Sequence, residues 1–150
     1  MKTGLALLAA LALACPALAD PGGREAEAFL RGYTQVWAAK DAAALSARFY
    51  RFDNPQAPMA SEAGVAAEFA RLAQAGYERS EIAAVEGCQL SPQTGLGVIR
   101  FTRLLRDGRP MPPKDRATLY VLRKFPDGWR ITAMAPMSGS AEVSCRSATP

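Results

Sequence analysis

The segment ATLYVLRKFPDGWRI, residues 117–131, constrains the fold more than any other part of the chain. It holds two runs rich in β-branched and aromatic residues, separated by Pro126-Asp127-Gly128. Such runs form strands, and Pro, Asp and Gly together form a tight turn, so the segment predicts a β-hairpin. The short connection makes the two strands antiparallel neighbours. A hairpin indicates a shape, but it does not indicate a reaction.

The spacing of apolar residues is strand-like from Tyr77 to Met137. We expect four strands there, because turn-forming segments rich in Pro, Gly, Asp and Ser divide the region. Neither face of the second and third expected strands is wholly polar, which is typical of a sheet that partly covers helices and partly lines a cavity. The expected strands span residues 79–90, 95–106, 116–125 and 129–136.

The region before these strands has a helical pattern. Apolar residues recur at steps of three and four over residues 24–39, as in an amphipathic helix. Asp41 is a suitable N-cap for a short second helix, and Ser61 for a third over residues 62–75. Gly76 follows the third helix, in a position that favours left-handed backbone geometry.

Residues 1–19 have the features of a secretory signal peptide. Lys2 gives a positive start, an apolar run follows, and Ala17-Leu18-Ala19 offers a cleavage site. The run is well short of the ~20 residues that span a bilayer, so we expect export to the periplasm or secretion, without stable membrane insertion after cleavage. The alternatives are a membrane anchor and a lipoprotein signal that ends at Cys15.

Removal of the signal leaves two of the three cysteines, Cys88 and Cys145. In an oxidising compartment this number favours one disulfide between them. The alternative is a buried Cys88 and a free thiol at Cys145.

The remaining chain is long enough for one domain, which we place at residues 20–137, followed by a flexible tail over residues 138–150. Without Lys2, 17 basic residues oppose 14 acidic ones, and most of the basic residues are arginines scattered among acids. A nucleic-acid partner is not expected, because nucleic-acid readers cluster their basic residues.

The order of these elements resembles the nuclear transport factor 2-like superfamily, which includes SnoaL-like polyketide cyclases and ketosteroid isomerases. The resemblance covers roughly residues 24–137. It rests on the pair Tyr33 and Trp37 in the first helix, an aromatic and acidic segment that includes Tyr50, Phe52 and Asp53, and the final hairpin.

The resemblance implies an α+β fold, with three N-terminal helices packed on a strongly curved antiparallel sheet of four to five strands. Together they form a cone with a pocket. The sheet face of such proteins commonly forms a homodimer. The residues that would line the pocket are Trp37, Tyr50, Phe52, Tyr77, Phe101 and Tyr120.

The chain contains no histidine. A Ser-His-Asp triad, a Cys-His dyad and a histidine-ligated metal site are therefore excluded. It also has no glycine-rich phosphate-binding loop, and we expect neither a cofactor nor a metal.

Carboxylate and tyrosine chemistry remains, as in the ketosteroid isomerases. Asp53 is the candidate base, with Tyr50, Tyr77 or Tyr120 as its acid partner. This role requires Asp53 to point into the pocket, about 3–6 Å from a tyrosine hydroxyl. The alternative is that Asp53 forms an ordinary turn before Pro55.

Arg79, Arg100 and Arg103 are candidates to hold an anionic ligand, because a guanidinium pairs well with a carboxylate or phosphate. Arg100 and Arg103 point to opposite faces of one strand, so only one of them can face the pocket. The alternative for each is a surface ion pair.

Three functions remain open. The first is a non-catalytic, exported domain that binds a small apolar or weakly anionic molecule. The second is an interaction or dimerisation module of the cell envelope. The third is a cofactor-free isomerase, dehydratase or cyclase with Asp53 as base.

Overall fold

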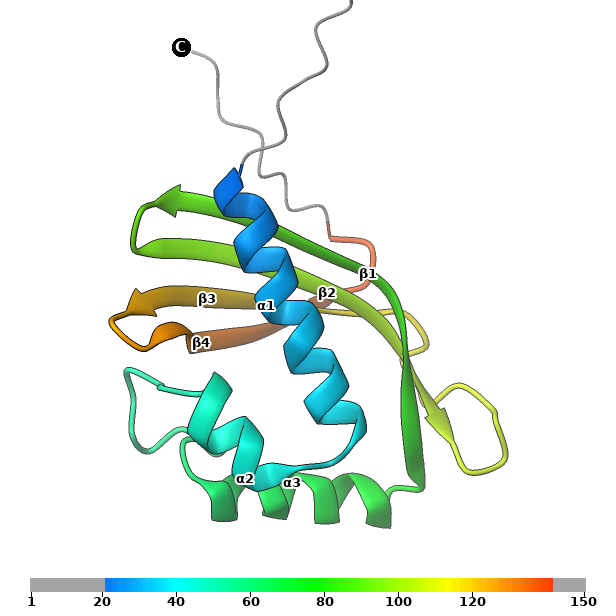
Figure 1. The fold of residues 1–150 in the computed structure, drawn as a ribbon. Coiled ribbons are helices and arrows are strands. Elements are labelled where there is room, and N and C mark those ends of the chain that lie inside the picture. The colour runs from blue at the N-terminus through cyan, green and yellow to red at the C-terminus, as the bar shows by residue number, and fades with distance from the viewer. Residues whose placement is uncertain (1–20, 142–150) are drawn as a thin grey trace, which may run out of the picture.

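The computed structural model describes residues 21–141, which form three helical segments followed by four strands (Figure 1). The predicted α+β arrangement is confirmed, and its strands form one antiparallel sheet in the order β1-β2-β3-β4. The helical elements are α1 (Pro21–Ala38), α2 (Ala42–Ala44), which continues directly into the π-helical turn η1 (Leu45–Phe49), and α3 (Glu62–Gln74). The strands are β1 (Tyr77–Ser91), β2 (Thr94–Leu105), β3 (Arg116–Phe125) and β4 (Gly128–Ser138).

The sheet is strongly curved. β1 and β2 are its longest strands, and Figure 1 shows both bending around the helical layer. The register between them shifts at three places along β1, and such irregularities increase bending and twist. The helices occupy the concave side, with α1 lying across the strands (Figure 1).

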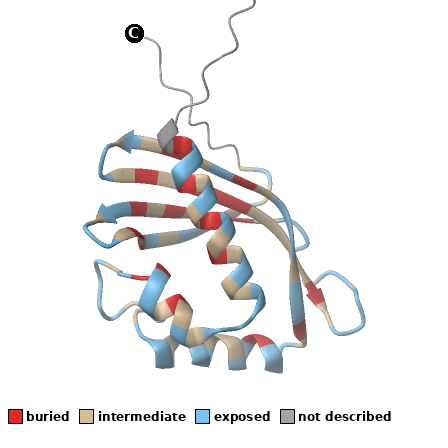
Figure 2. Cartoon of the chain, viewed as in Figure 1, coloured by how far each residue is buried: buried red, intermediate tan, exposed pale blue. Residues whose placement is uncertain are grey.

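Helix α1 packs on the sheet through one apolar face. Ala26, Leu30 and Tyr33 are buried, and they share this face because they are spaced by three and four residues. Figure 2 shows buried residues at intervals along α1 and in the strands that it crosses. Gly87 of β1 allows the close approach, because a Cβ atom there would lie 2.6 Å from the backbone nitrogen of Glu27.

The predicted helix caps are confirmed. The Asp41 side chain accepts a hydrogen bond from the Ala44 amide at 2.9 Å, and Ser61 Oγ accepts one from the Gly64 amide at 3.2 Å. Gly76 ends α3 with a φ of 82°, and β1 begins at the next residue. The strand therefore starts two residues earlier than its pattern predicts.

The segment at residues 50–53 runs beside β4, at the edge of the sheet. Tyr50 forms a parallel bridge with Ile131, and the amides of Arg51 and Asp53 donate to the carbonyls of Ile131 and Thr132 at 3.0 Å each. These bonds bring the aromatic residues around Tyr50 against the end of the sheet.

On the convex side, Arg100 of β2 holds the chain that follows β4. Its guanidinium donates to the carbonyl oxygens of Gly139 at 2.8 Å and Ala141 at 2.7 Å. The expected tail therefore begins within β4 and is anchored as far as Ala141. The rest of it lies outside the described residues, as do the predicted signal peptide (residues 1–19) and Cys145. No helix among residues 21–141 is long and apolar enough to span a membrane.

Candidate ligand-binding pocket

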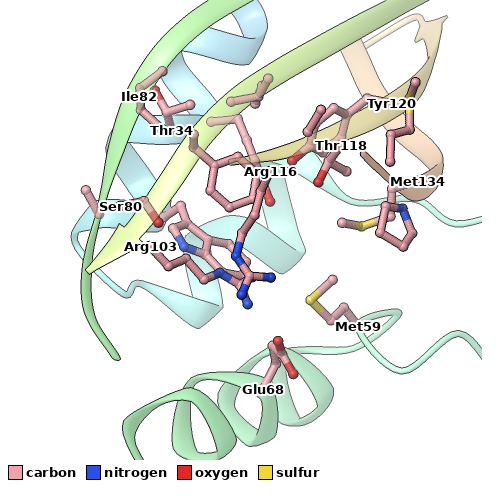
Figure 3. A pocket seen from close by; sticks show the side chains of 18 of the residues that line it. Thr34, Met59, Glu68, Ser80, Ile82, Arg103, Arg116, Thr118, Tyr120 and Met134 are labelled. Atoms are coloured by element: carbon pink, nitrogen blue, oxygen red, sulfur yellow. The ribbon is translucent and has the colours of Figure 1, made fainter. Parts of the chain in front are cut away.

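A cavity of about 470 Å³ lies between the concave face of the sheet, α1 and α3 (Figure 3). This size is within the range of pockets that hold small organic molecules. Most of its wall is apolar, and the residues that form this part are Trp37, Ala38, Met59, Ile82, Ile99, Phe101, Pro113, Ala117, Met134, Pro136 and Met137. The polar part consists of Tyr33, Thr34, Glu68, Arg71, Ser80, Arg103, Arg116, Thr118 and Tyr120.

Three of the six aromatic residues expected in the pocket line it, namely Trp37, Phe101 and Tyr120. They come from α1, β2 and β3, so the pocket joins the helical layer to the middle of the sheet. Trp37 also packs against Phe69 of α3, with ring centroids 4.8 Å apart. This contact closes the wall between the two helices.

The other three, Tyr50, Phe52 and Tyr77, do not line the pocket. Tyr50 packs against Phe52 in the core, with ring centroids 5.0 Å apart. Tyr77 is buried at the start of β1, where its hydroxyl accepts a hydrogen bond from Trp37 Nε1 at 3.3 Å. Tyr77 therefore holds Trp37, a residue of the pocket wall, without lining the pocket itself.

A cluster of tyrosines lies where α1 meets the sheet. The hydroxyls of Tyr33 and Tyr50 are 2.9 Å apart and hydrogen-bonded, and the Tyr120 ring packs edge-on against Tyr33. Burial raises the pKa of all three phenols, most of all for Tyr33 and Tyr120. None of these phenols is therefore a base at neutral pH, and in the Tyr33–Tyr50 pair one hydroxyl donates and the other accepts.

Two arginines reach the pocket from neighbouring strands, Arg103 from β2 and Arg116 from β3. Arg103 lies beside the rings of Tyr77 and Phe101, 5.8 and 5.7 Å from their centroids. Arg116 Nη2 donates to the carbonyl of Pro112 at 2.6 Å. The Nε atoms of both arginines are buried and have no hydrogen-bond partner within the described chain.

Glu68 is the acidic residue of the pocket wall, and it is already paired. Both of its carboxylate oxygens accept from Arg71 on the same helix, at 2.6 and 2.7 Å. The same contact raises the pKa of Arg71, and the ion pair occupies the Glu68 carboxylate.

Asp53, the candidate base, lies outside the pocket. Its side chain is 63% exposed and pairs with Arg123 at 3.3 Å. The requirement of the base hypothesis, a carboxylate in the pocket beside a tyrosine hydroxyl, is therefore not met by Asp53. The physical reason is that Asp53 follows the edge bridge of Tyr50 and faces solvent rather than the concave side.

The three candidate anion-binding arginines have separate positions. Arg103 lines the pocket, whereas Arg100 points to the opposite face, as the alternation along a strand predicts. Arg79 is exposed and forms a surface ion pair with Glu81 at 2.8 Å. Within residues 21–141 there is no group of three or more Asp, Glu or Cys side chains that could hold a metal ion.

Tyr33 and Arg116 are wall residues that the sequence analysis did not select for the pocket. Both have a signal in the sequence. Tyr33 lies one helical turn before Trp37, so the two share a face of α1. Arg116 lies four residues before Tyr120, and every second residue of a strand shares a face.

Known structures share this architecture. An NTF2-like protein with a cystatin-like fold from Novosphingobium aromaticivorans matches with a TM-score of 0.56 and 16% identity, over 79% of this chain and 82% of that chain. A ketosteroid isomerase-like protein from Erwinia carotovora matches with a TM-score of 0.53 and 19% identity, over 81% of this chain and 98% of that chain. The fold is nuclear transport factor 2-like.

A third match supports the same NTF2-like fold. It is a domain of unknown function with a cystatin-like fold from Nostoc punctiforme, with a TM-score of 0.53 and 19% identity over 75% of this chain and 74% of that chain. No protein-family model and no curated protein matches the sequence. At these identities the NTF2-like architecture is shared, and the function has to be argued from the pocket itself.

Proposed function

We propose that this NTF2-like domain binds a small, largely apolar molecule in its pocket and does not transform it. The observation that carries the proposal is the cavity of about 470 Å³ with a mainly apolar wall and a few convergent polar groups. Preformed apolar cavities with a small number of placed polar groups are the usual sites for small ligands.

Binding is favoured over catalysis by the state of the polar groups. Proton abstraction needs a base within hydrogen-bond reach of the ligand. The carboxylate in the wall, Glu68, is held by Arg71, and Asp53 is on the surface. Burial raises the pKa of Tyr33 and Tyr120 further above neutrality, so neither phenol supplies a base.

We also propose that the protein acts outside the cytoplasm, with residues 1–19 removed and Cys88 bonded to Cys145. Cys88 lies opposite Leu96 in the sheet, and Leu96 is four residues from Arg100, which holds Ala141. Four residues of strand cover about 13 Å, and the four residues from Ala141 to Cys145 can span a similar distance. Cys145 is therefore within reach of Cys88.

The test uses N-phenylnaphthylamine, a neutral apolar dye whose fluorescence rises when it leaves water. It is titrated into the wild-type protein and into Thr34→Trp, which places a large side chain in the pocket. Gln35→Trp is the matched control, because Gln35 is the next residue of α1 and is exposed. We expect the wild type and the control to bind the dye and Thr34→Trp to lose about tenfold or more in affinity.

Equal binding by all three proteins would contradict the proposal, because the dye would then sit elsewhere. Absence of binding to the wild type would contradict it as well. Turnover of ketone or epoxide substrates by the purified protein would contradict the non-catalytic part alone.

A further inference from the structure

Arg103 and Arg116 form a pair of cations on the concave face. Arg116 is aligned with Phe101 across β2 and β3, and Arg103 is two residues further along β2, on the same face. Figure 3 shows both side chains extending into the pocket, where their charges act on each other. In the rest of this subsection we call these two residues the arginine pair.

The arginine pair has unused hydrogen-bonding capacity. Arg103 is steadied by the rings of Tyr77 and Phe101, which contact the guanidinium without accepting its N–H groups. Arg116 uses Nη2 for the carbonyls of Pro112 and Met111, at 2.6 and 3.4 Å. The Nε atoms of both remain buried without an acceptor in the described chain, although buried polar atoms are almost always hydrogen-bonded.

The charge of the arginine pair is also not balanced. Among residues 21–141, no acidic side chain lies within ion-pair distance of either guanidinium, whereas Glu68 is taken by Arg71. Burial and the charge of Arg103 lower the pKa of Arg116, as expected for two neighbouring cations. Both arginines are only partly buried, and an anion between them would offset the repulsion of the two like charges.

We propose that the arginine pair is the head-group site of the pocket, and that the ligand is an amphiphile with one acidic group and an apolar body. The acidic group is a carboxylate, sulfonate or phosphate, which accepts N–H bonds from the guanidinium groups of both arginines. The apolar body lies against Ile99, Phe101 and Met134, and Thr118 and Tyr120 add hydroxyls beside it. This inference rests on the proposed binding function and specifies the ligand of the same pocket.

The test compares two dyes of nearly the same shape. Anilinonaphthalene sulfonate carries an acidic group on the body of N-phenylnaphthylamine, which is neutral. We expect the wild-type protein to bind the sulfonate dye about tenfold more tightly than the neutral dye, since charge-assisted bonds supply the difference. This comparison needs no variant, so it does not depend on whether a variant folds.

Variants then locate the head group. Arg103→Gln and Arg116→Gln are each expected to weaken the sulfonate dye about tenfold and to change the neutral dye by less than about twofold. Arg123→Gln is the matched control, because it removes the same charge from the exposed side of β3. If a Gln variant does not fold, the Lys variant at the same position, Arg103→Lys or Arg116→Lys, is measured in its place. The Lys variant keeps the charge.

The outcomes separate this inference from the proposed function. If the neutral dye binds but the sulfonate dye binds no better, the head-group site is wrong and the binding function stands. If neither dye binds, both are wrong. An equal loss in Arg123→Gln would also overturn the head-group site, because the effect would then come from the general field of the protein.

Displacement of the sulfonate dye identifies the class of acid. Decanoate, decyl phosphate and decanol share one apolar chain and differ in the head group. We expect at least one of the two acids to displace the dye at a concentration about tenfold below that of decanol. Equal displacement by all three compounds would overturn the proposal.

Discussion

Arg100 and Arg103 lie three residues apart on β2, on opposite faces of the sheet, and their surroundings differ completely. On the convex face, Arg100 donates to the carbonyls of Gly139 and Ala141 and lies 3.4 Å from Glu86. On the concave face, Arg103 has a buried Nε without an acceptor and a second guanidinium, that of Arg116, beside it.

This comparison distinguishes an arginine that stabilises the fold from arginines that are available to bind a ligand. The convex arginine satisfies its donors with the protein itself, so it fixes the chain that leaves β4. The concave arginines line a cavity and have no ion-pair partner within residues 21–141, so their charge is available to a bound anion. Four predictions test this contrast, starting with the largest expected effect.

Leu30→Ala tests whether the concave side carries the core. Leu30 is fully buried between α1 and the sheet, so its truncation should lower the free energy of unfolding by about 2–5 kcal/mol. Leu90→Ala is the control, since Leu90 is 62% exposed, and its effect should stay below about 0.5 kcal/mol. Urea denaturation of both variants measures the difference in the free energy of unfolding. Equal effects would contradict a core on the concave side.

Cys88→Ser tests whether the convex side is tied to the end of the chain. Loss of a disulfide to Cys145 should lower the stability of the oxidised protein by about 2–4 kcal/mol, because the unfolded chain gains freedom. The measurement is the melting temperature with and without reductant. A variant that melts with the wild type under oxidising conditions would contradict the disulfide.

Arg100→Gln and Arg103→Gln compare the two faces directly. Arg100→Gln should lower the free energy of unfolding by about 1–2 kcal/mol, because two charge-assisted bonds to backbone carbonyls are lost. Arg103→Gln should leave the stability unchanged or raise it slightly, because it removes a cation that repels Arg116 and has no ion-pair partner within residues 21–141. Chemical denaturation without ligand measures the free energy of unfolding of both variants. A larger loss in Arg103→Gln than in Arg100→Gln would contradict the difference between the two faces.

Asp53→Asn should have the smallest effect. The pair of Asp53 with Arg123 is exposed, and such pairs contribute about 0–1 kcal/mol. We expect less than about 0.5 kcal/mol in stability and no change in the affinity for either dye. A loss of dye affinity in this variant would contradict the position of Asp53 outside the pocket.

The sequence predicts the fold well because the signals are local. The turn at Pro126-Asp127-Gly128, the caps Asp41 and Ser61, and the position of Gly76 each determine a short stretch of backbone, and all are observed. The π-helical turn from Leu45 to Phe49 was not predicted, because its i to i+5 bonding has no distinct pattern of apolar residues.

The lining of the pocket is harder to predict, because it depends on whether each aromatic side chain faces the cavity or packs elsewhere. Tyr50 and Tyr77 are the same residue type as Tyr120. They are nevertheless buried among neighbouring side chains and do not line the pocket. The alternation of β2 does predict that Arg100 and Arg103 face opposite ways, but it does not say which of them is inside. That choice depends on the direction in which the sheet curves.

A crystal structure of the protein with anilinonaphthalene sulfonate tests the central claim most directly. We expect the dye in the pocket, with its sulfonate oxygens within about 3 Å of guanidinium nitrogens of Arg103 and Arg116. Dye bound outside the pocket, or inside it with the sulfonate turned away from both arginines, would contradict the account.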